Sequence, residues 1–306
     1  MTTVGTMVHE SDFEDQAKLV EYLASQLVRG RLAVFLGTGA SNWYGLPDWD
    51  ELVVRMYELA DAGRPDKALD VRDQAEDLFL GKLKGDNRAL LSLVHNALYS
   101  YEGPITLDFE KIRGDNLLAS VGALLMASRR GSVSQVVTLN YDDLLEKYLG
   151  FHGFVVESVS KPNCFATYAD VHVLHPHGYV PFEGTGVSSR ILLTRKSYSE
   201  GIGEDWRRLC LTVLRHHTIL FVGLSGRDDS LDSLVVNARS DNSANDHPAI
   251  IENSPYWGVS FGCRGSAAAK RWRDRGVFFS EVANYETALP TLIFTICQTA
   301  SRLRSR

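Results

Sequence analysis

Cysteine is scarce in this sequence, and the residues present are widely separated. The chain has four cysteines, Cys164, Cys210, Cys263 and Cys297, and no two of them form a CxxC pair. Structural zinc sites and disulfide frameworks need cysteines in closely spaced or regularly repeated pairs. The spacing therefore argues against both a zinc ribbon and a disulfide-stapled scaffold.

Long apolar runs and an excess of basic charge are also missing. No run of about 18 apolar residues exists, and the N-terminus is acidic where a signal peptide would be basic and then apolar. The net charge of −6 argues against a protein that mainly grips nucleic-acid backbone. The basic clusters at 264–275 and 302–306 are expected to be solvated helix faces and a chain terminus. We expect a cytoplasmic protein that neither crosses a membrane nor binds nucleic acid directly.

The chain is organised around residues 31–50. Leu32–Leu36 is a continuous apolar run, too short for a helix and suited to a buried parallel strand. The turn that follows, Gly37–Ser41, reads GTGAS and would let the backbone approach a pyrophosphate. The third glycine of the GxGxxG fingerprint is absent. By itself, this turn is only a weak indication of a nucleotide site.

Strands and helices alternate through most of the remaining chain. Further strands are predicted at 135–139, 154–157, 171–174, 191–194, 218–222 and 256–261. Helices are predicted from a capping box at 11–14 through 28, and at 49–60, 67–81, 87–101, 116–130, 143–149, 204–217, after 228, and at 286–302. This alternation is typical of an α/β, Rossmann-like, doubly wound parallel sheet. Residues 61–130 show only helical patterning, so we predict a helical insertion within one domain that spans 1–306.

Polar clusters follow four of the predicted strands, at 37–41, 140–142, 175–178 and 223–225. In a doubly wound sheet, ligands bind outside the carboxyl ends of the strands. Residues in this position can also serve as helix caps, and that alternative stays open for Asn140, Asp142 and Ser225. The agreement of four clusters favours a binding site.

In their order, these motifs resemble the sirtuin-like domain over residues 28–240. The motifs are GTGAS with Gly45-Leu46-Pro47, Thr138–Asp142 (TLNYD) with Leu144–Glu146, His177-Gly178, and Val222–Ser225 (VGLS) followed by Asp228 or Asp229. Classical sirtuin deacylases also carry a zinc module of two cysteine pairs, which this chain lacks. They continue the Gly-Ile-Pro-Asp turn with Phe-Arg, where this chain has Trp49-Asp50. These departures point to bacterial sirtuin-like proteins that resemble the NAD hydrolases of phage defence.

The resemblance implies an NAD⁺ glycohydrolase that cleaves the nicotinamide–ribose bond and depletes NAD in antiviral, abortive-infection defence. NAD would be its substrate, and no metal is expected. Asn140 and His177 would be the catalytic residues. The residues expected to bind the dinucleotide are Gly37, Thr38, Gly39, Ala40, Ser41, Asp48, Asp142, Gly223 and Ser225.

The chemistry of the two catalytic candidates agrees with this implication. Cleavage passes through an oxocarbenium-like ribose, as in glycoside hydrolysis, and cationic nicotinamide is already a good leaving group. Asn140 offers a donor and an acceptor for a ribose hydroxyl or the attacking water. His177 can take a proton near neutral pH. The alternative for His177 is a structural role.

Several neighbouring residues keep more than one interpretation. Asp142 could bind ribose, order Asn140 or cap a helix. Asp48 and Trp49 could close over the nicotinamide end or simply build a turn. A metal site at His172, His175 and His177 is disfavoured, because alternate strand residues face opposite sides and no carboxylate or cysteine ligand lies nearby in sequence. His175 is expected to pack behind the site. Tyr198 is similar to a tyrosine in these proteins, and we assign it no role.

Such a toxic activity needs restraint, and the chain has no room for a sensing domain after the fold is complete. We therefore expect a homo-oligomer controlled by a separate protein. The resemblance favours a HerA-type ATPase, with a prokaryotic argonaute as an alternative. Two other functions stay open: a non-catalytic module that binds NAD or ADP-ribose, and an NAD-dependent protein deacylase.

Overall fold

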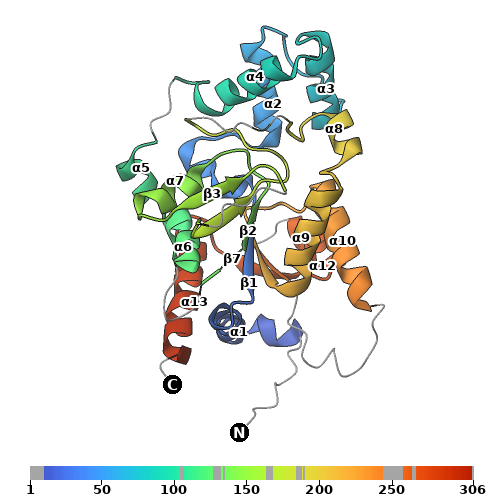
Figure 1. The fold of residues 1–306 in the computed structure, drawn as a ribbon. Coiled ribbons are helices and arrows are strands. Elements are labelled where there is room, and N and C mark those ends of the chain that lie inside the picture. The colour runs from blue at the N-terminus through green and yellow to red at the C-terminus, as the bar shows by residue number, and fades with distance from the viewer. Residues whose placement is uncertain are drawn as a thin grey trace. The chain divides into compact units, whose positions relative to one another are not determined.

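A parallel sheet forms the centre of the fold. The computed structural model describes residues 10–103, 107–126, 132–133, 135–162, 168–183, 188, 190–243, 258–263 and 267–304. Within these residues, seven strands form one sheet in the order β3-β4-β2-β1-β5-β6-β7, with helices in the connections (Figure 1). The predicted Rossmann-like α/β fold is confirmed. The strand order changes direction at β1, and ligands of open α/β sheets bind at such a switch point.

The elements agree with most of the predicted ones in type and order. The strands are β1 Leu32–Leu36, β2 Gln135–Thr138, β3 Val156–Val159, β4 Val171–Leu174, β5 Thr218–Val222, β6 Gly258–Cys263 and β7 Phe278–Val282. The α-helices are α1 Gln16–Val28, α2 Trp49–Leu59, α3 Val71–Gly81, α4 Asn87–Tyr99, α5 Phe109–Arg113, α6 Asn116–Leu125, α7 Leu144–Phe151, α8 Arg195–Glu200, α9 Glu204–His216, α10 Asp229–Ser243, α12 Ala268–Asp274 and α13 Ala288–Arg304. Three 3₁₀ helices are η1 Glu10–Glu14, η2 Thr38–Ala40 and η3 Asn42–Tyr44.

Two local predictions are wrong. Residues 191–194 form no strand: Ile191, Leu192 and Leu193 are buried, but Leu192 bonds through its N–H to the His177 carbonyl (2.8 Å) and not to a neighbouring strand. The capping box at 11–14 is instead a 3₁₀ helix, and α1 starts later with Asp15 as its N-cap. Residues 256 and 257, at the start of the strand predicted at 256–261, lie outside the described residues.

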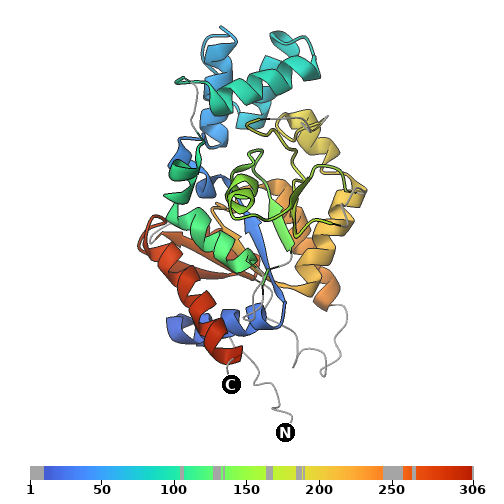
Figure 2. The same ribbon diagram turned by 60° about the vertical axis from the view of Figure 1, so that its left-hand side comes forward.

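By its contacts, the chain divides into two compact units. The first comprises residues 1–35, 115–136 and 207–306. In it β6 pairs in parallel with β5 and with β7, and α13 packs against both α1 and α6 (Figure 2). Gly258 on β6 makes room for the Phe221 ring, since a Cβ there would lie 2.8 Å from that ring. Small residues in β6 thus let bulky apolar side chains fill this part of the core.

The second unit comprises residues 36–114 and 137–206. Its helix α2 packs on α3 and α4, α3 packs on α8, and α7 packs on α5 and β3. Strand β3 pairs in parallel with β4. The segment 61–130, predicted as a helical insertion, is divided between the two units. Residues 61–114 belong to this unit, whereas α6 belongs to the first. The single domain over 1–306 stays a prediction. No helix among the described residues is both long and apolar enough to cross a bilayer.

Candidate active site

The site is built in the second unit, on the turn that follows β1. The backbone at Gly37 is extended (φ −131°), and η2 follows, with Ala40 N–H donating to the Gly37 carbonyl at 2.9 Å. Gly45, after η3, has φ +76°, a left-handed conformation that favours glycine. The chain then reverses into α2, whose N-cap is Asp48. The turn therefore presents Ser41 and Asp48 near the end of the strand.

Asn140 follows β2, and hydrogen bonds fix the orientation of its side chain. The Leu139 N–H donates to the Leu36 carbonyl at 3.0 Å, which brings the end of β2 beside the end of β1. The Asn140 side chain is 6% exposed, and its Nδ2 donates to the Gly37 carbonyl (3.1 Å) and to Ser41 Oγ (3.0 Å). Because a carbonyl oxygen only accepts, the first bond fixes which end of the amide is nitrogen. Among the described residues, Oδ1 has no hydrogen-bond partner.

Asp142 plays two of the roles that the sequence left open. Its Oδ2 accepts from Ser41 Oγ at 2.8 Å, and Ser41 in turn accepts from Asn140, so Asp142 orders Asn140 through the hydroxyl. Its Oδ1 also accepts from the Leu144 N–H at 3.3 Å, at the start of α7. Burial raises the pKa of the Asp142 carboxyl, against the hydrogen bonds from Ser41 and Leu144, which lower it. A ribose contact by Asp142 stays a prediction.

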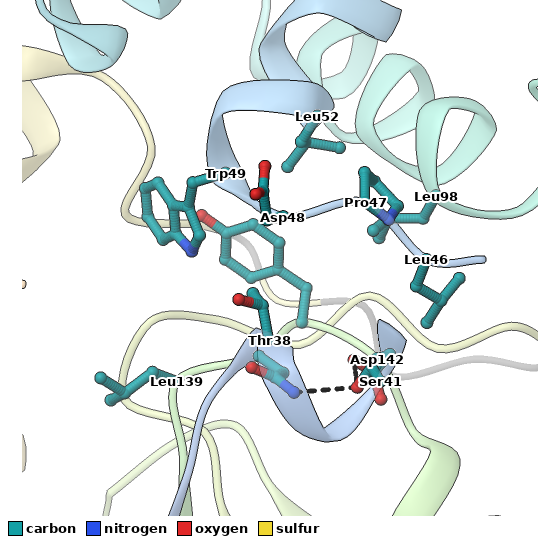
Figure 3. Close-up of a pocket in the computed structure, with 12 residues that line it drawn as sticks. Thr38, Ser41, Leu46, Pro47, Asp48, Trp49, Leu52, Leu98, Leu139 and Asp142 are labelled. Atoms are coloured by element: carbon teal, nitrogen blue, oxygen red, sulfur yellow. Dashed lines mark hydrogen bonds between the residues drawn. The ribbon is translucent and has the colours of Figure 1, made fainter. Parts of the chain in front are cut away.

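A small cavity lies beside these groups (Figure 3). Thr38, Ser41 and Asp142 lie on one side of it, and Asp48 and Trp49 on the other. Its volume of about 20 Å³ admits a single water molecule and no sugar ring. Asp48 also accepts from the Glu51 N–H at 2.9 Å, so the turn-building role predicted as an alternative is present. A nucleotide can enter only if side chains at this mouth move.

His177 packs in an aromatic cluster that also contains Trp49, a residue of the cavity wall. Its fully buried ring lies 6.1 Å from the Trp49 ring and 5.9 Å from the Tyr198 ring, centroid to centroid. Trp49 lines the cavity and also contacts Tyr141 (5.8 Å) and Tyr198 (5.6 Å). The cavity lining includes Asn140 but not His177.

The three histidines of this region face different partners. His172 Nε2 lies 3.3 Å from Glu157 Oε2, whereas His175 Nε2 lies 2.6 Å from Glu146 Oε1. No three His, Cys, Asp or Glu side chains in the described part of the chain are grouped to hold a metal ion. Glu146 belongs to one of the sequence motifs but was given no role there, because a glutamate on an amphipathic helix is ordinarily solvent-exposed.

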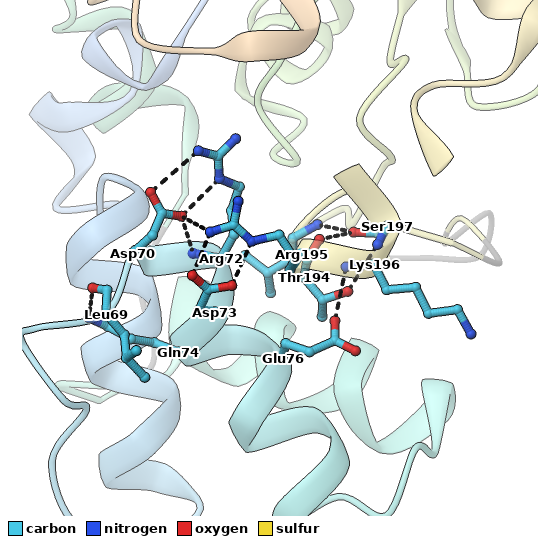
Figure 4. A network of polar contacts seen from close by, with 11 residues as sticks. Leu69, Asp70, Arg72, Asp73, Gln74, Glu76, Thr194, Arg195, Lys196 and Ser197 are labelled. Atoms are coloured by element: carbon cyan, nitrogen blue, oxygen red, sulfur yellow. Dashed lines mark hydrogen bonds and ion pairs between the residues drawn. The ribbon is translucent and has the colours of Figure 1, made fainter. Parts of the chain in front are cut away.

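An ion-pair network ties α8, which carries Tyr198, to α3 (Figure 4). Arg195 binds Asp73 through two bonds, Nε to Oδ1 at 2.6 Å and Nη2 to Oδ2 at 2.5 Å. The Arg72 guanidinium lies 5.2 Å from the centroid of the Tyr198 ring. These contacts hold the Tyr198 ring beside Trp49 and His177. The local sequence does not predict the contacts between α3 and α8, because Asp73 and Arg195 are 122 residues apart.

Asp143, next to the site, gives the protein a pH-dependent stability. Its Oδ1 accepts from the Phe182 N–H (3.0 Å), Lys147 Nζ lies 3.9 Å from Oδ2, and burial raises its pKa to about 6. Since this pKa lies above the unfolded value, the stabilisation is full below about pH 4 and is lost as the pH rises through about 6.

We expect Asp143→Asn, which keeps an acceptor for Phe182, to be more stable than wild type at pH 7.5 by up to about 3 kcal/mol. The gain should shrink toward pH 4.5. Urea denaturation of both proteins at the two pH values checks this, and an equal difference at both would contradict the assignment.

Gly223 and Ser225 belong to the first unit. Gly223 follows β5 with φ +70°. The Ser225 carbonyl accepts from Arg271 through Nε (3.1 Å) and Nη2 (2.9 Å), and the Gly226 carbonyl accepts from Arg275 Nη1 (2.7 Å). These arginines on and after α12 fix the loop. Dinucleotide binding by Gly223 and Ser225 stays a prediction.

Of the predicted residues, the structure thus joins Gly37, Ser41, Asn140 and Asp142 in one hydrogen-bonded set. Thr38 and Asp48 line the cavity beside it, and Gly39 and Ala40 shape the turn.

A comparison with protein-family models agrees with the sirtuin-like resemblance. A family model of the SIR2-like domain matches residues 134–279, which include Asn140, His177 and Ser225. A structure described under the mechanism and regulation of Sir2 enzymes is 14% identical, with a TM-score of 0.48, and the match covers 96% of this chain and 99% of that chain. A Sir2 homologue in complex with NAD is 13% identical, with a TM-score of 0.47, and 94% of each chain is covered. No curated protein matches the sequence.

Proposed function

We propose that this chain binds NAD⁺ and hydrolyses its nicotinamide–ribose bond to give nicotinamide and ADP-ribose. The observation that carries the proposal is Asn140 Oδ1, a buried acceptor with no partner among the described residues, on the wall of a water-sized cavity. Buried polar atoms seldom lack a partner, so Oδ1 is the atom that a bound water or a ligand hydroxyl would satisfy. The SIR2-like match over residues 134–279 supports NAD as that ligand.

The fixed orientation of Asn140 suits one step of the reaction. Its Nδ2 is used by Gly37 and Ser41, so only Oδ1 is left to meet a ligand, and it can only accept. A ribose hydroxyl or the attacking water supplies such a donor. Held at this point, the water lies where it can add to C1′ of the ribose. The arrangement provides positioning with no reorganisation during the reaction.

The bonds broken and formed in the proposed hydrolysis balance, with His177 as the acceptor of the proton. The C1′–N bond breaks with its electron pair going to the nicotinamide ring, which becomes neutral. The water oxygen bonds to C1′ of the oxocarbenium-like ribose, and its proton leaves to His177. Trp49, which lines the cavity and contacts His177, must turn for substrate to enter and for His177 to come within reach of the water.

The decisive experiment follows NAD⁺ incubated with the purified chain by chromatography, beside His177→Gln. We expect nicotinamide and ADP-ribose in equal amounts from the wild type, and a loss of roughly 10²-fold in the variant, as for removal of a general base. Release that needs an acetylated peptide would instead favour the deacylase. Stoichiometric binding without turnover would favour the binding module and contradict the hydrolase.

We further propose that the activity serves bacterial antiviral defence by depleting NAD, and that it is restrained by assembly into a homo-oligomer with a regulatory protein, in the first instance a HerA-type ATPase. The physical reason is that an unrestrained NAD hydrolase would harm its own cell. Sedimentation velocity tests this part separately. A monomer with full activity and no partner would contradict it.

A further inference from the structure

A line of buried polar groups runs behind Asn140. The His175 ring is fully buried, with Nδ1 3.2 Å from the Asn140 carbonyl oxygen and Nε2 2.6 Å from Glu146 Oε1. Ser158 Oγ donates to the same Glu146 oxygen at 3.0 Å. The four residues come from β3, from α7, and from the segments after β2 and β4. They therefore link three strands and a helix to the backbone of one candidate catalytic residue.

The partners of His175 determine where its protons are. A carbonyl oxygen only accepts, so Nδ1 carries a hydrogen and donates it to Asn140. One further proton lies between Nε2 and Glu146, giving either an imidazolium beside a carboxylate or a neutral imidazole beside a carboxylic acid. Both arrangements keep the two hydrogen bonds and the same total charge. His175 is thus locked in place whichever group holds the shared proton.

We propose that Glu146 and His175 are positioning residues, which hold the Asn140 main chain so that Oδ1 meets the substrate or its water. The inference rests on the proposed function and deepens it. Asn140 N–H is bound by Thr138 Oγ1 at 3.1 Å and its carbonyl by His175, so the peptides on both sides are fixed. His175 bonds to the Asn140 carbonyl and Glu146 bonds to His175, so both residues act through Asn140.

A contribution to stability does not explain why His175 and Glu146 are paired in the core. The side chains of His175 and Glu146 are 0% and 10% exposed, and a buried ion pair repays its desolvation poorly compared with apolar residues of similar size. A second histidine–glutamate pair joins the same two strands: His172 on β4 lies opposite Glu157 on β3, with Nε2 and Oε2 3.3 Å apart. This second pair provides the control.

The test replaces each pair by apolar residues of similar volume. Because such exchanges are often neutral or stabilising, we expect Glu146→Met/His175→Phe to fold with an unchanged or higher Tm. Its kcat for NAD⁺ hydrolysis should fall roughly 10- to 100-fold with KM changed less than about threefold, since misplacement by about 1 Å costs on that order. Glu157→Met/His172→Phe should keep the wild-type kcat. Glu146→Gln, whose amide can donate to Nε2, should restore most of it.

A second readout does not depend on turnover. The side-chain amide resonances of Asn140, identified by their loss in Asn140→Asp, should shift in Glu146→Met/His175→Phe and stay in place in the control double variant. Unshifted resonances would overturn the inference whether or not the protein cleaves NAD⁺. Wild-type turnover with an equal kcat in both double variants would overturn it while leaving the proposed function intact. If the wild type does not turn over NAD⁺ but the Asn140 resonances shift in Glu146→Met/His175→Phe, the proposed function is contradicted and the positioning role is kept.

Discussion

Asn140→Ala is expected to lower NAD⁺ hydrolysis by roughly 10²- to 10³-fold, the effect of removing one preorganised group that acts on the reacting centre. The substitution removes Oδ1, the acceptor left for the substrate, and also the bonds from Nδ2 to Gly37 and Ser41. The two lost bonds should cost about 1–3 kcal/mol of stability, so the variant is expected to fold. Initial rates of nicotinamide release, with circular dichroism as a check on folding, measure both effects.

Two further variants sharpen this test. Asn140→Asp keeps the shape and an oxygen at Oδ1 but places a second oxygen against the Gly37 carbonyl, so it should also be slow. Asn42→Ala alters an exposed asparagine of the same turn and should stay within about twofold of wild type, as a surface substitution does. An Asn140→Ala rate within a few-fold of wild type would remove Asn140 from the mechanism.

The neighbourhood of Asn140 could be predicted because it follows from general rules. Residues 32–36 and 135–139 are predicted as buried strands, and the ends of parallel strands meet at one edge of a sheet. The residues directly after those strands, Gly37 and Asn140, therefore come together, as the 3.1 Å bond between them demonstrates. A prediction of this kind needs only the order of the elements.

What escaped prediction depends on contacts between distant segments. Residues 191–194 are apolar and buried, but burial does not reveal whether a strand lies alongside to pair with them. Glu146 looks like an ordinary polar residue of α7, and its partner His175 is 29 positions away. The small volume of the cavity beside Trp49 likewise results from the packing of side chains, which periodicity does not describe. Such features become visible only in three dimensions.

Gly178→Ala is expected to destabilise the protein by about 3 kcal/mol, through backbone strain and overpacking together. Gly178 has φ +114°, where residues with a Cβ are strained. A Cβ there would lie 2.7 Å from Ile191 Cγ2 and 2.9 Å from the Arg190 carbonyl oxygen. The chain cannot easily yield, because the His177 carbonyl accepts from the Leu192 N–H at 2.8 Å and Gly178 N–H donates to the His175 carbonyl at 3.1 Å.

Because of these hydrogen bonds, we expect Gly178→Ala to disturb the candidate active site as well as the stability of the protein. Relief of the clash must push Gly178 and the 190–192 segment apart, and His177, the preceding residue, moves with it. We therefore expect NAD⁺ hydrolysis to fall at temperatures where Gly178→Ala is still folded, beside a lower urea midpoint. Gly150→Ala is the matched control: it lies in α7 with open space around its Cβ, so alanine should be neutral or stabilise by up to about 1 kcal/mol. Equal urea midpoints for Gly178→Ala and Gly150→Ala would show that the backbone at Gly178 adapts to the added Cβ. They would contradict the inference that His177 is tightly held.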